Sequence, residues 1–263
     1  MVHKSIVSTN SLQKGRNNMN KENLLSKISK MSEEELRDLA CNTPDVEILN
    51  ILAENENCEV RCAVAGNKNT PVEKLTVLAS AETWWVRSAV AANKNTSADI
   101  LTMLAKDINL DVHASVARNN NTPVETLVML GCDKTWWVRS AVARNKNTPA
   151  EVLAMLAKDE DYDVRLAVAN NRNTPVNVLA MLAKDEDIDV RYEVAANENT
   201  SVDVLAMLAK DVDIDVRVAV AENPRTPYNT LIMLTKVKAL EIREKAKEIL
   251  KERTLKANTN KER

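Results

Sequence analysis

The sequence is poor in the residues that many folds use for turns and aromatic cores. Its 263 residues include three glycines and no phenylalanine, and aromatic residues make up only 3%. A hydrophobic core must therefore be built from Val, Leu, Ile, Met and Ala. Regular alternation of apolar and polar residues is also missing, so almost nothing predicts β-strands. These absences favour an all-helical protein.

Long apolar runs are absent as well. No segment has the roughly 20 unbroken apolar residues that a transmembrane helix requires, so we expect no membrane span. Residues 1–20 are polar and lack the apolar region of a signal peptide, and we expect a disordered N-terminal tail there. The net charge of −2 argues against a protein that binds polyanions with its whole surface. We expect a cytoplasmic location.

Motifs for catalysis are also missing. The sequence has no Ser-His-Asp set, phosphate loop or HExxH motif, and its two histidines, His3 and His113, have no plausible metal-binding companions. We therefore predict that the protein is not an enzyme and needs no cofactor.

A Val-Arg step recurs every 26 residues. A fixed period of this length is typical of solenoids, in which each unit packs only on its neighbours. The steps lie at Val60-Arg61, Val86-Arg87, Val112-His113, Val138-Arg139, Val164-Arg165, Val190-Arg191 and Val216-Arg217.

Each unit contains signals for two helices. The first helix is preceded by a capping residue such as Asp161 and ends at an asparagine such as Asn171. Asparagine tolerates the left-handed conformation, so it can close a helix where glycine is scarce.

The second helix of each unit follows a Thr-Pro step. Thr70 is predicted to be its N-cap and Pro71 its first residue, with Glu73 completing a capping box. The same box is predicted at Glu125 and Glu151. In two units Ser97 and Ser201 replace the proline, and the preceding threonine is expected to keep the cap.

The units divide the chain into segments. We predict an N-terminal cap with a degenerate repeat at 21–56, seven full repeats at 57–238, and a C-terminal capping helix at 239–253. A frayed tail is expected at 254–263. Terminal units of solenoids are usually atypical because they must shield the last apolar face.

The repeated pattern VRxAVAxNxNTPxxxLxxLAxD resembles the leucine-rich repeat variant family, a helical repeat similar in style to HEAT repeats. The resemblance covers roughly residues 32–245 and recurs seven times. It implies an all-α, right-handed solenoid, or superhelix, of seven two-helix repeats with helical caps. In the family's best-known form, α and 3₁₀ helices alternate. The resemblance implies no enzyme activity.

The cysteines leave a metal site as an alternative, because the family's prototype carries an N-terminal cysteine cluster that holds an iron–sulfur centre. Cys58 and Cys62 are four residues apart and share a helix face, and Cys41 lies in the adjacent cap. Cys132 is about three units away, and no Cys-x-x-Cys motif exists. Reduced thiols are the other interpretation.

All four tryptophans occur as two pairs, Trp84-Trp85 and Trp136-Trp137, each followed by VRSAVA. Trp84 and Trp136 are expected to be half-buried, whereas Trp85 and Trp137 replace a solvent-facing aspartate. The pairs either pack against a neighbouring repeat or a second copy, or form an aromatic platform for a peptide, base or sugar.

Charged and apolar side chains also recur in rows. The Arg row is expected either to pair with first-turn carboxylates such as Asp163, Asp189 and Asp215 or to form an anion-binding stripe. The Met row, for example Met155 and Met181, is expected to be core. The turn after the first helix is basic in the earlier units.

These features predict a non-enzymatic scaffold that binds a protein or peptide through a Trp/Arg surface on the first to fourth full repeats. The partner is expected to be acidic, and binding of a nucleic-acid backbone along the basic edge is the alternative. The oligomeric state stays open. The predicted binding residues are Trp84, Trp85, Trp136, Trp137, Arg87, His113, Arg118, Arg139, Arg144 and Lys146.

Overall fold

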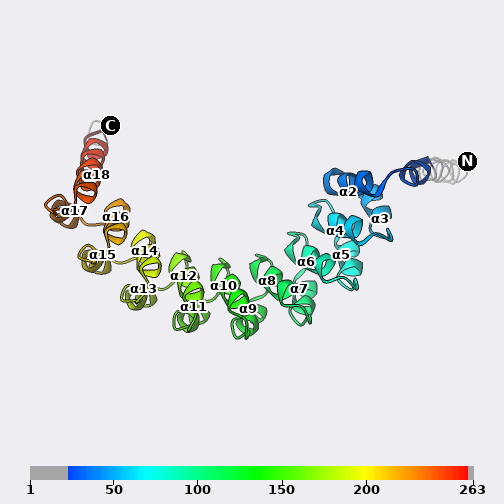
Figure 1. The fold of residues 1–263 in the computed structure, drawn as a ribbon, viewed down its shortest axis with the longest axis horizontal. Helices are drawn as coiled ribbons and strands as arrows, with labels where there is room; N and C mark the ends of the chain where they lie inside the picture. Colours follow the sequence, from blue (N-terminus) through cyan, green and yellow to red (C-terminus); the bar gives the residue numbers. More distant parts are fainter. Residues whose placement is uncertain (1–22, 260–263) are drawn as a thin grey trace, which may run out of the picture. The chain divides into compact units, whose positions relative to one another are not determined.

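The computed structural model of the chain describes residues 23–259, and the predicted tail at 1–20 lies outside them. The described residues form helices and no strand, which confirms the all-α prediction (Figure 1). The chain divides into two compact units, Met1–Leu104 (unit 1) and Ala105–Arg263 (unit 2). Each unit is a succession of short helices joined by tight turns.

Helices of nine and seven residues alternate along the repeats, and equivalent helices start 26 residues apart. Unit 1 contains α2 (Glu33–Asn42), α3 (Val46–Leu52), α4 (Cys58–Gly66), α5 (Val72–Leu78), α6 (Trp84–Ala92) and α7 (Ala98–Leu104). Unit 2 contains α8 (Leu110–Arg118), α9 (Val124–Leu130), α10 (Trp136–Arg144), α11 (Ala150–Leu156), α12 (Tyr162–Asn170), α13 (Val176–Leu182), α14 (Ile188–Ala196), α15 (Val202–Leu208), α16 (Ile214–Glu222), α17 (Tyr228–Leu234) and α18 (Leu240–Thr259).

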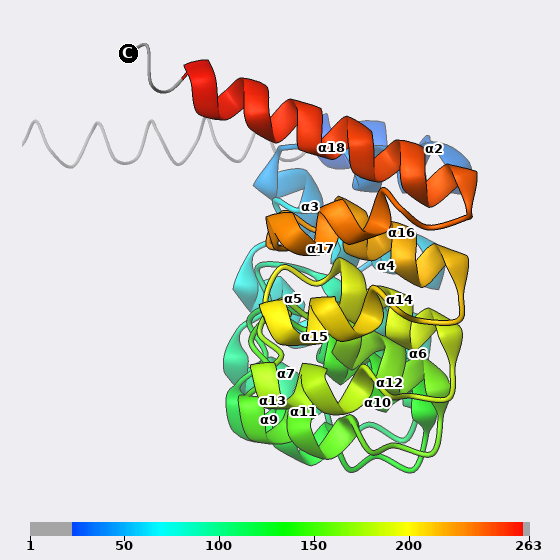
Figure 2. The ribbon, with the colours of Figure 1, turned by 90° about the vertical axis from the view of Figure 1, so that its left-hand side faces the viewer.

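The helices of each unit form two layers. In unit 2 the even-numbered helices pack directly against one another, whereas α9, α11, α13 and α15 mainly contact the even helices next to them in the chain (Figure 2). The even helices bury small residues such as Ala167 and Ala169, which allow close approach of neighbouring backbones. The odd helices point leucines such as Leu179 and Leu182 into the space between the layers.

The predicted N-caps of the even helices are confirmed in five repeats. Asp161 Oδ1 accepts a hydrogen bond from the Asp163 amide at 2.9 Å, and Asp163 lies in the first turn, where the helix dipole favours its charge. Thr83 and Thr135 also occupy the N-cap position but make no capping hydrogen bond through their side chains. The other side-chain caps are Asn57, Asn109, Asp187 and Asp213.

The predicted left-handed asparagine at the end of each even helix is wrong. Asn171 is extended, with φ −68° and ψ 124°, and no residue that the structure describes has a positive φ. Its buried side chain instead reaches the preceding repeat. Nδ2 donates to the carbonyl oxygens of Ala143 at 2.6 Å and Asn145 at 3.0 Å, while Oδ1 accepts from the Asn173 amide at 2.8 Å. The asparagine therefore links consecutive repeats.

The predicted threonine cap of the odd helices is also wrong. Thr174 is buried, and its hydroxyl donates to the Val168 carbonyl at 2.6 Å, which satisfies the end of the preceding even helix. Pro175 takes the N-cap position without a side-chain hydrogen bond. Where serine replaces this proline, Ser201 itself caps by accepting from the Val204 amide at 3.3 Å.

The capping boxes predicted with Glu73, Glu125 and Glu151 do not form, because the N-cap residues there are prolines. A capping box does form between Ser32 and Glu35, at the start of α2. The odd helices are α-helical rather than 3₁₀. In α13 the 3₁₀-type hydrogen bonds are confined to the two ends, where the Pro175 carbonyl accepts from the Val178 amide and the Met181 carbonyl from the Lys184 amide.

Helix α18 closes unit 2 and runs to Thr259, beyond the predicted end at Arg253. It buries Ile242 and Ala246. The Arg253 guanidinium donates to the Asn223 and Thr226 carbonyls at 2.9 and 2.6 Å. Arg253 thus supplies donors to carbonyls in the turn that follows α16. Within 23–259, no helix is both long and apolar enough to cross a membrane.

The predicted burial of the methionine row is wrong. Met155 and Met181 are 43% and 38% exposed on the odd helices. These helices have no third layer on their outer side, so alternate apolar positions face solvent. The row adds soft apolar surface to the odd-helix layer rather than core volume.

Candidate functional site

Trp136 and Trp137 open helix α10, directly after its N-cap, Thr135. Their rings meet edge to face, with centroids 5.8 Å apart and an interplanar angle of 88°. They are 40% and 38% exposed, so the second tryptophan is no more exposed than the first. The two indoles support each other and still present apolar surface to solvent.

Unit 1 contains the same arrangement at the start of α6. Trp84 and Trp85 lie 5.8 Å apart at 87° and are 39% and 40% exposed. The shared geometry follows from the shared sequence WWVRSAVA, because the helix start fixes both backbones. Each unit therefore displays one aromatic pair.

A basic pocket of about 620 Å³ lies at the other end of α10 in unit 2. Arg144, Lys146 and Arg172 line it together with asparagine side chains. The Asn173 side chain donates to the Lys146 carbonyl and so holds the two adjacent turns together. The sequence identified Arg144 and Lys146 as binding residues, and the structure brings them into one pocket.

The cationic surface around this pocket ends in the next repeat, where carboxylates take over. Glu198 lies 3.6 Å from the Arg172 guanidinium, and Glu193 accepts a hydrogen bond from Asn170 at 2.6 Å. The cationic surface is consequently short. Arg118 extends it on the other side, since it ends α8, which packs on α10.

Trp137 and Arg144 share one helix, seven residues apart. Seven residues make nearly two turns, so both side chains leave α10 on the same side, separated by about 10 Å along its axis. The aromatic pair and the basic pocket of unit 2 therefore lie at opposite ends of one helix face.

Arg139 is used internally. Its guanidinium makes two parallel hydrogen bonds to Asp159, Nε–Oδ2 at 2.6 Å and Nη2–Oδ1 at 2.8 Å, and donates to the Asp133 carbonyl. The two charged side chains are only 12% and 8% exposed. The predicted pairing of the Arg row is confirmed for Arg139, but the partner lies 20 residues later and is not the predicted first-turn Asp163.

The same pairing recurs between Arg165 and Asp185 and between Arg191 and Asp211. Burial opposes ionisation of Asp159, but the hydrogen bonds from Arg139 and from the Asp161 amide outweigh it, so the pKa of Asp159 lies below its usual value. The hydrogen bond to Asp159 in turn raises the pKa of Arg139. These ion pairs join the turns of successive repeats.

His113 replaces the arginine of this row in its repeat. Its Nδ1 lies 2.9 Å from Asp133 Oδ2 and its Nε2 lies 2.7 Å from the Asp107 carbonyl oxygen. Burial opposes ionisation of Asp133, yet hydrogen bonds from His113 and Thr135 lower the pKa of Asp133. Arg87, in unit 1, donates to the Ala81 and Glu82 carbonyls. The geometry gives His113 and Arg87 structural contacts.

The cysteines of unit 1 lie near Trp85. Cys41, Cys62 and Trp85 line a pocket of about 470 Å³ together with Arg37 and Glu59. Burial raises the pKa of the Cys62 thiol, and the neighbouring Cys41 and Cys58 raise it further. Cys132 belongs to unit 2.

These thiols do not fit an iron–sulfur centre. Such clusters usually need four thiolates, whereas unit 1 contains three cysteines, Cys41, Cys58 and Cys62. Across 23–259, no group of three or more Cys, His, Asp or Glu side chains is arranged to hold a metal ion. We derive no chemistry through such a cluster.

Comparisons with known proteins agree with this architecture. Residues 136–161 and 162–187 each match the model of the leucine-rich repeat variant family. A solved structure described as a leucine-rich repeat variant with a novel repetitive protein structural motif is 28% identical. It covers 81% of this chain and 82% of its own, with a TM-score of 0.57. No curated protein sequence matches the chain.

Two further solved structures are more distant. YibA of Escherichia coli is 21% identical, with 88% of this chain and 96% of its own covered and a TM-score of 0.49. An archaeal HEAT-like repeats protein from Thermococcus onnurineus NA1 is 16% identical, with 84% and 96% covered and a TM-score of 0.29. The predicted resemblance to helical repeat proteins is confirmed by the family match and the first structure.

Proposed function

We propose that this chain, whose repeats are leucine-rich repeat variants, is a non-enzymatic scaffold that binds an acidic segment of another protein on its even-helix layer. The observation that carries the proposal is the placement of Trp137 and Arg144 on one face of α10. An exposed aromatic pair supplies apolar contact area, and a pocket with three cations orients carboxylates.

The separation of the two features predicts the partner's motif. An extended peptide advances about 3.3–3.6 Å per residue, so about three residues cover the roughly 10 Å between Trp137 and Arg144. The partner is expected to carry an apolar or aromatic residue about three positions from a pair of acidic residues.

The predicted binding residues of unit 2 fall into two groups: those that would contact the partner and those that hold the turns beneath the contact surface. Trp136, Trp137, Arg118, Arg144 and Lys146 form the binding surface of unit 2. In the proposal, Arg139 and His113 hold the turns beneath that surface, because both are engaged by carboxylates.

Trp84 and Trp85 offer a second aromatic anchor, on unit 1. Arg87 has a supporting role there, since it hydrogen-bonds two carbonyl groups. The anchor of unit 1 adds apolar contact area for the same partner or for a second copy of its motif.

A protein segment fits the basic pocket better than a nucleic-acid backbone does. Proteins that track single strands use an extended positive groove and lose affinity steeply with salt. Here Glu193 and Glu198 interrupt the cationic surface one repeat after the pocket. A weak salt dependence and no binding of an oligonucleotide would separate the two partners.

The proposal is tested by changing Trp85→Asp and Trp137→Asp together. Aspartate stands at the equivalent position of other repeats, for example Asp163, so the fold should persist. Affinity purification from the native cell is expected to recover a protein partner with wild type and to lose it with this variant. The matched control is Ile108→Asp, which removes an exposed apolar side chain outside the proposed surface. Recovery of the same partner by all three proteins would refute the proposal.

A further inference from the structure

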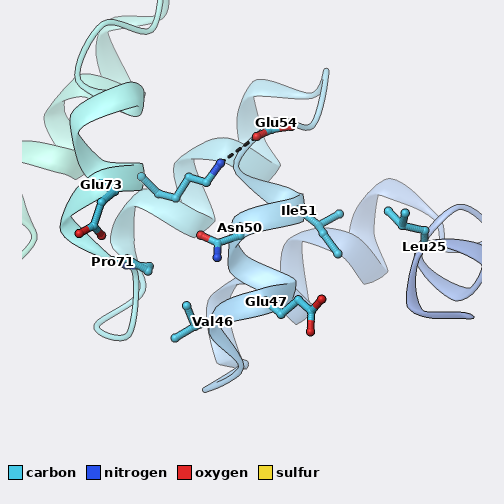
Figure 3. Close-up of a pocket in the computed structure, with 9 residues that line it drawn as sticks. Leu25, Val46, Glu47, Asn50, Ile51, Glu54, Pro71 and Glu73 are labelled. Carbon is cyan, nitrogen blue, oxygen red and sulfur yellow. Dashed lines mark hydrogen bonds and ion pairs between the residues drawn. The ribbon is translucent and has the colours of Figure 1, made fainter. Parts of the chain in front are cut away.

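The odd-helix layer carries grooves that the proposed function does not use. In unit 1, a groove of about 890 Å³ lies between α3 and α5 (Figure 3). Leu25, Val46, Ile51 and Pro71 supply its apolar lining, and Leu25 and Val46 are exposed on it. The groove exists because successive odd helices pack against each other less closely than the even helices beneath them do.

The rim of this groove is acidic. Figure 3 shows Glu47 on α3 and Glu73 on α5, and neither carboxylate makes an ion pair with any residue that the structure describes. Glu54 and Lys74 form a bridge of 2.8 Å between the two helices. Three carboxylates and one ammonium group therefore line the groove, with a formal charge of −3 + 1 = −2.

Unit 2 contains a second groove, lined by α15, by Arg191 of α14 and by the turns that follow α13 and α15. It measures about 930 Å³ and includes Met207, which is 38% exposed, and Val212, which is 90% exposed. The Glu186 side chain is 93% exposed and lies 3.9 Å from the Arg165 guanidinium, and Asp203 adds a second exposed carboxylate. Arg191 and Lys210 line the groove as well. Asp185 and Asp211 also line the groove but are held by Arg165 and Arg191.

We propose that the odd-helix layer is a second interaction surface, whose grooves bind a cationic segment with apolar side chains from another protein. Both grooves combine apolar lining with exposed carboxylates, which favours lysine or arginine side chains next to aliphatic ones. Glu47, Glu73 and Asp203 make no ion pair with any residue that the structure describes. Lysine and arginine stems also pack on apolar surface while their charged ends meet carboxylates. The exposed methionine adapts to side chains of different shape.

This surface is chemically opposite to the one proposed for the even-helix layer. The even layer presents tryptophans and cations, whereas the odd layer presents aliphatic side chains and carboxylates. One scaffold is thus equipped to hold an acidic segment and a basic segment at the same time. The two proposals rest on different residues, so either can fail without the other.

The test uses a fluorescein-labelled peptide of alternating lysine and leucine and the full-length protein. The groove variant carries Glu47→Gln, Glu73→Gln, Glu186→Gln and Asp203→Asn. The control variant removes the same number of exposed carboxylates elsewhere, with Glu34→Gln, Asp38→Asn, Glu241→Gln and Glu252→Gln. All eight side chains are exposed, so both variants are expected to fold, which circular dichroism checks.

The groove variant is expected to bind the peptide about tenfold or more weakly than the control variant, as measured by fluorescence anisotropy. A second peptide with serine in place of leucine is expected to bind wild type about tenfold more weakly, because it cannot use the apolar lining. Equal affinity of the groove and control variants would overturn the proposal. Equal affinity of the two peptides would also overturn it, since binding would then reflect charge alone.

Discussion

Asn171 Nδ2 donates a hydrogen bond of 2.6 Å to the carbonyl oxygen of Ala143, 28 residues earlier in the chain. The same contact joins Asn145 to Ala117, Asn197 to Ala169 and Asn223 to Ala195 in unit 2. In unit 1 it joins Asn67 to Ala40 and Asn93 to Ala65. Each asparagine satisfies carbonyl groups at the end of the previous even helix, where no intrahelical donor remains.

Asn171→Ala is therefore expected to lower the free energy of unfolding by about 1–3 kcal/mol, because the Ala143 and Asn145 carbonyls lose a buried donor. Urea denaturation followed by circular dichroism measures the change. Asn177→Ala is the control, since Asn177 is exposed on α13 and is expected to change stability by less than about 0.5 kcal/mol. Equal effects of the two substitutions would contradict the role of Asn171.

Arg61 lacks the carboxylate partner that Arg139, Arg165 and Arg191 have, because Ala81 stands 20 residues after it. Its guanidinium donates only to the Asn55 and Glu56 carbonyls. Ala81→Asp is expected to raise the free energy of unfolding by about 1–2 kcal/mol, since it supplies a partner for Arg61 and an acceptor for the Thr83 amide.

Ala81→Asn separates these two contributions. It provides the acceptor for the Thr83 amide, as Asn55 does for the Asn57 amide at 2.8 Å, but not the charge. The aspartate variant should be the more stable of the two in thermal unfolding. If Ala81→Asp is no more stable than Ala81→Asn, the ion pair does not form.

The pH dependence of stability is expected to follow Asp159 and Asp211. The pKa of each lies below its usual value, so the unfolded chain binds protons at a higher pH than the folded chain. Their contribution is present above about pH 4, the usual pKa range of an unfolded aspartate. It is lost as pH falls further, through the folded pKa.

The double variant Asp159→Asn, Asp211→Asn is consequently less stable than wild type near neutral pH, and the difference shrinks on acidification. Denaturant unfolding between pH 7 and acidic pH measures both curves. A difference that stays constant at every pH would show that the two carboxylates are not stabilised by Arg139 and Arg191.

The sequence predicted the helices well because local signals define them. The caps at Asp161 and Asp187 and the capping box at Ser32 each depend on residues within one turn of each other, and the 26-residue period repeats such local signals along the chain. The resemblance to leucine-rich repeat variants rests on the same local pattern.

The contacts between repeats were not predictable in the same way. Periodicity shows that Asn171 and Asn145 are equivalent, but not that one side chain reaches the carbonyl of the other. The prediction that Thr174 caps the following odd helix fails for the same reason. The Thr174 hydroxyl instead donates to the Val168 carbonyl of the preceding even helix. Met155 was assigned to the core because a seven-residue helix is too short to distinguish its buried face by period.

The candidate site was predictable in part. Trp137, Arg144 and Lys146 depart from the repeat consensus or lie in its basic turn, and the structure shows them exposed or in a pocket. Arg139 was expected either to pair internally or to bind an anion. The structure shows that the Arg139 guanidinium forms an ion pair with Asp159, 20 residues later in the chain. The grooves of the odd layer depend on helix spacing, which the sequence does not encode locally.

The binding claim is tested most directly by reversing the sign of the charge, first on a defined peptide ligand and then in the basic pocket of the protein. Fluorescence anisotropy would measure two labelled peptides, each with a leucine three residues from a pair of charged residues, acidic in one and basic in the other. Wild type is expected to prefer the acidic peptide more strongly than the Arg144→Glu, Lys146→Glu variant does, by about tenfold in the ratio of the two affinities. The odd-helix grooves are expected to bind the basic peptide alike in both proteins. If the variant and wild type show the same preference, the basic pocket does not select the partner and the account is wrong.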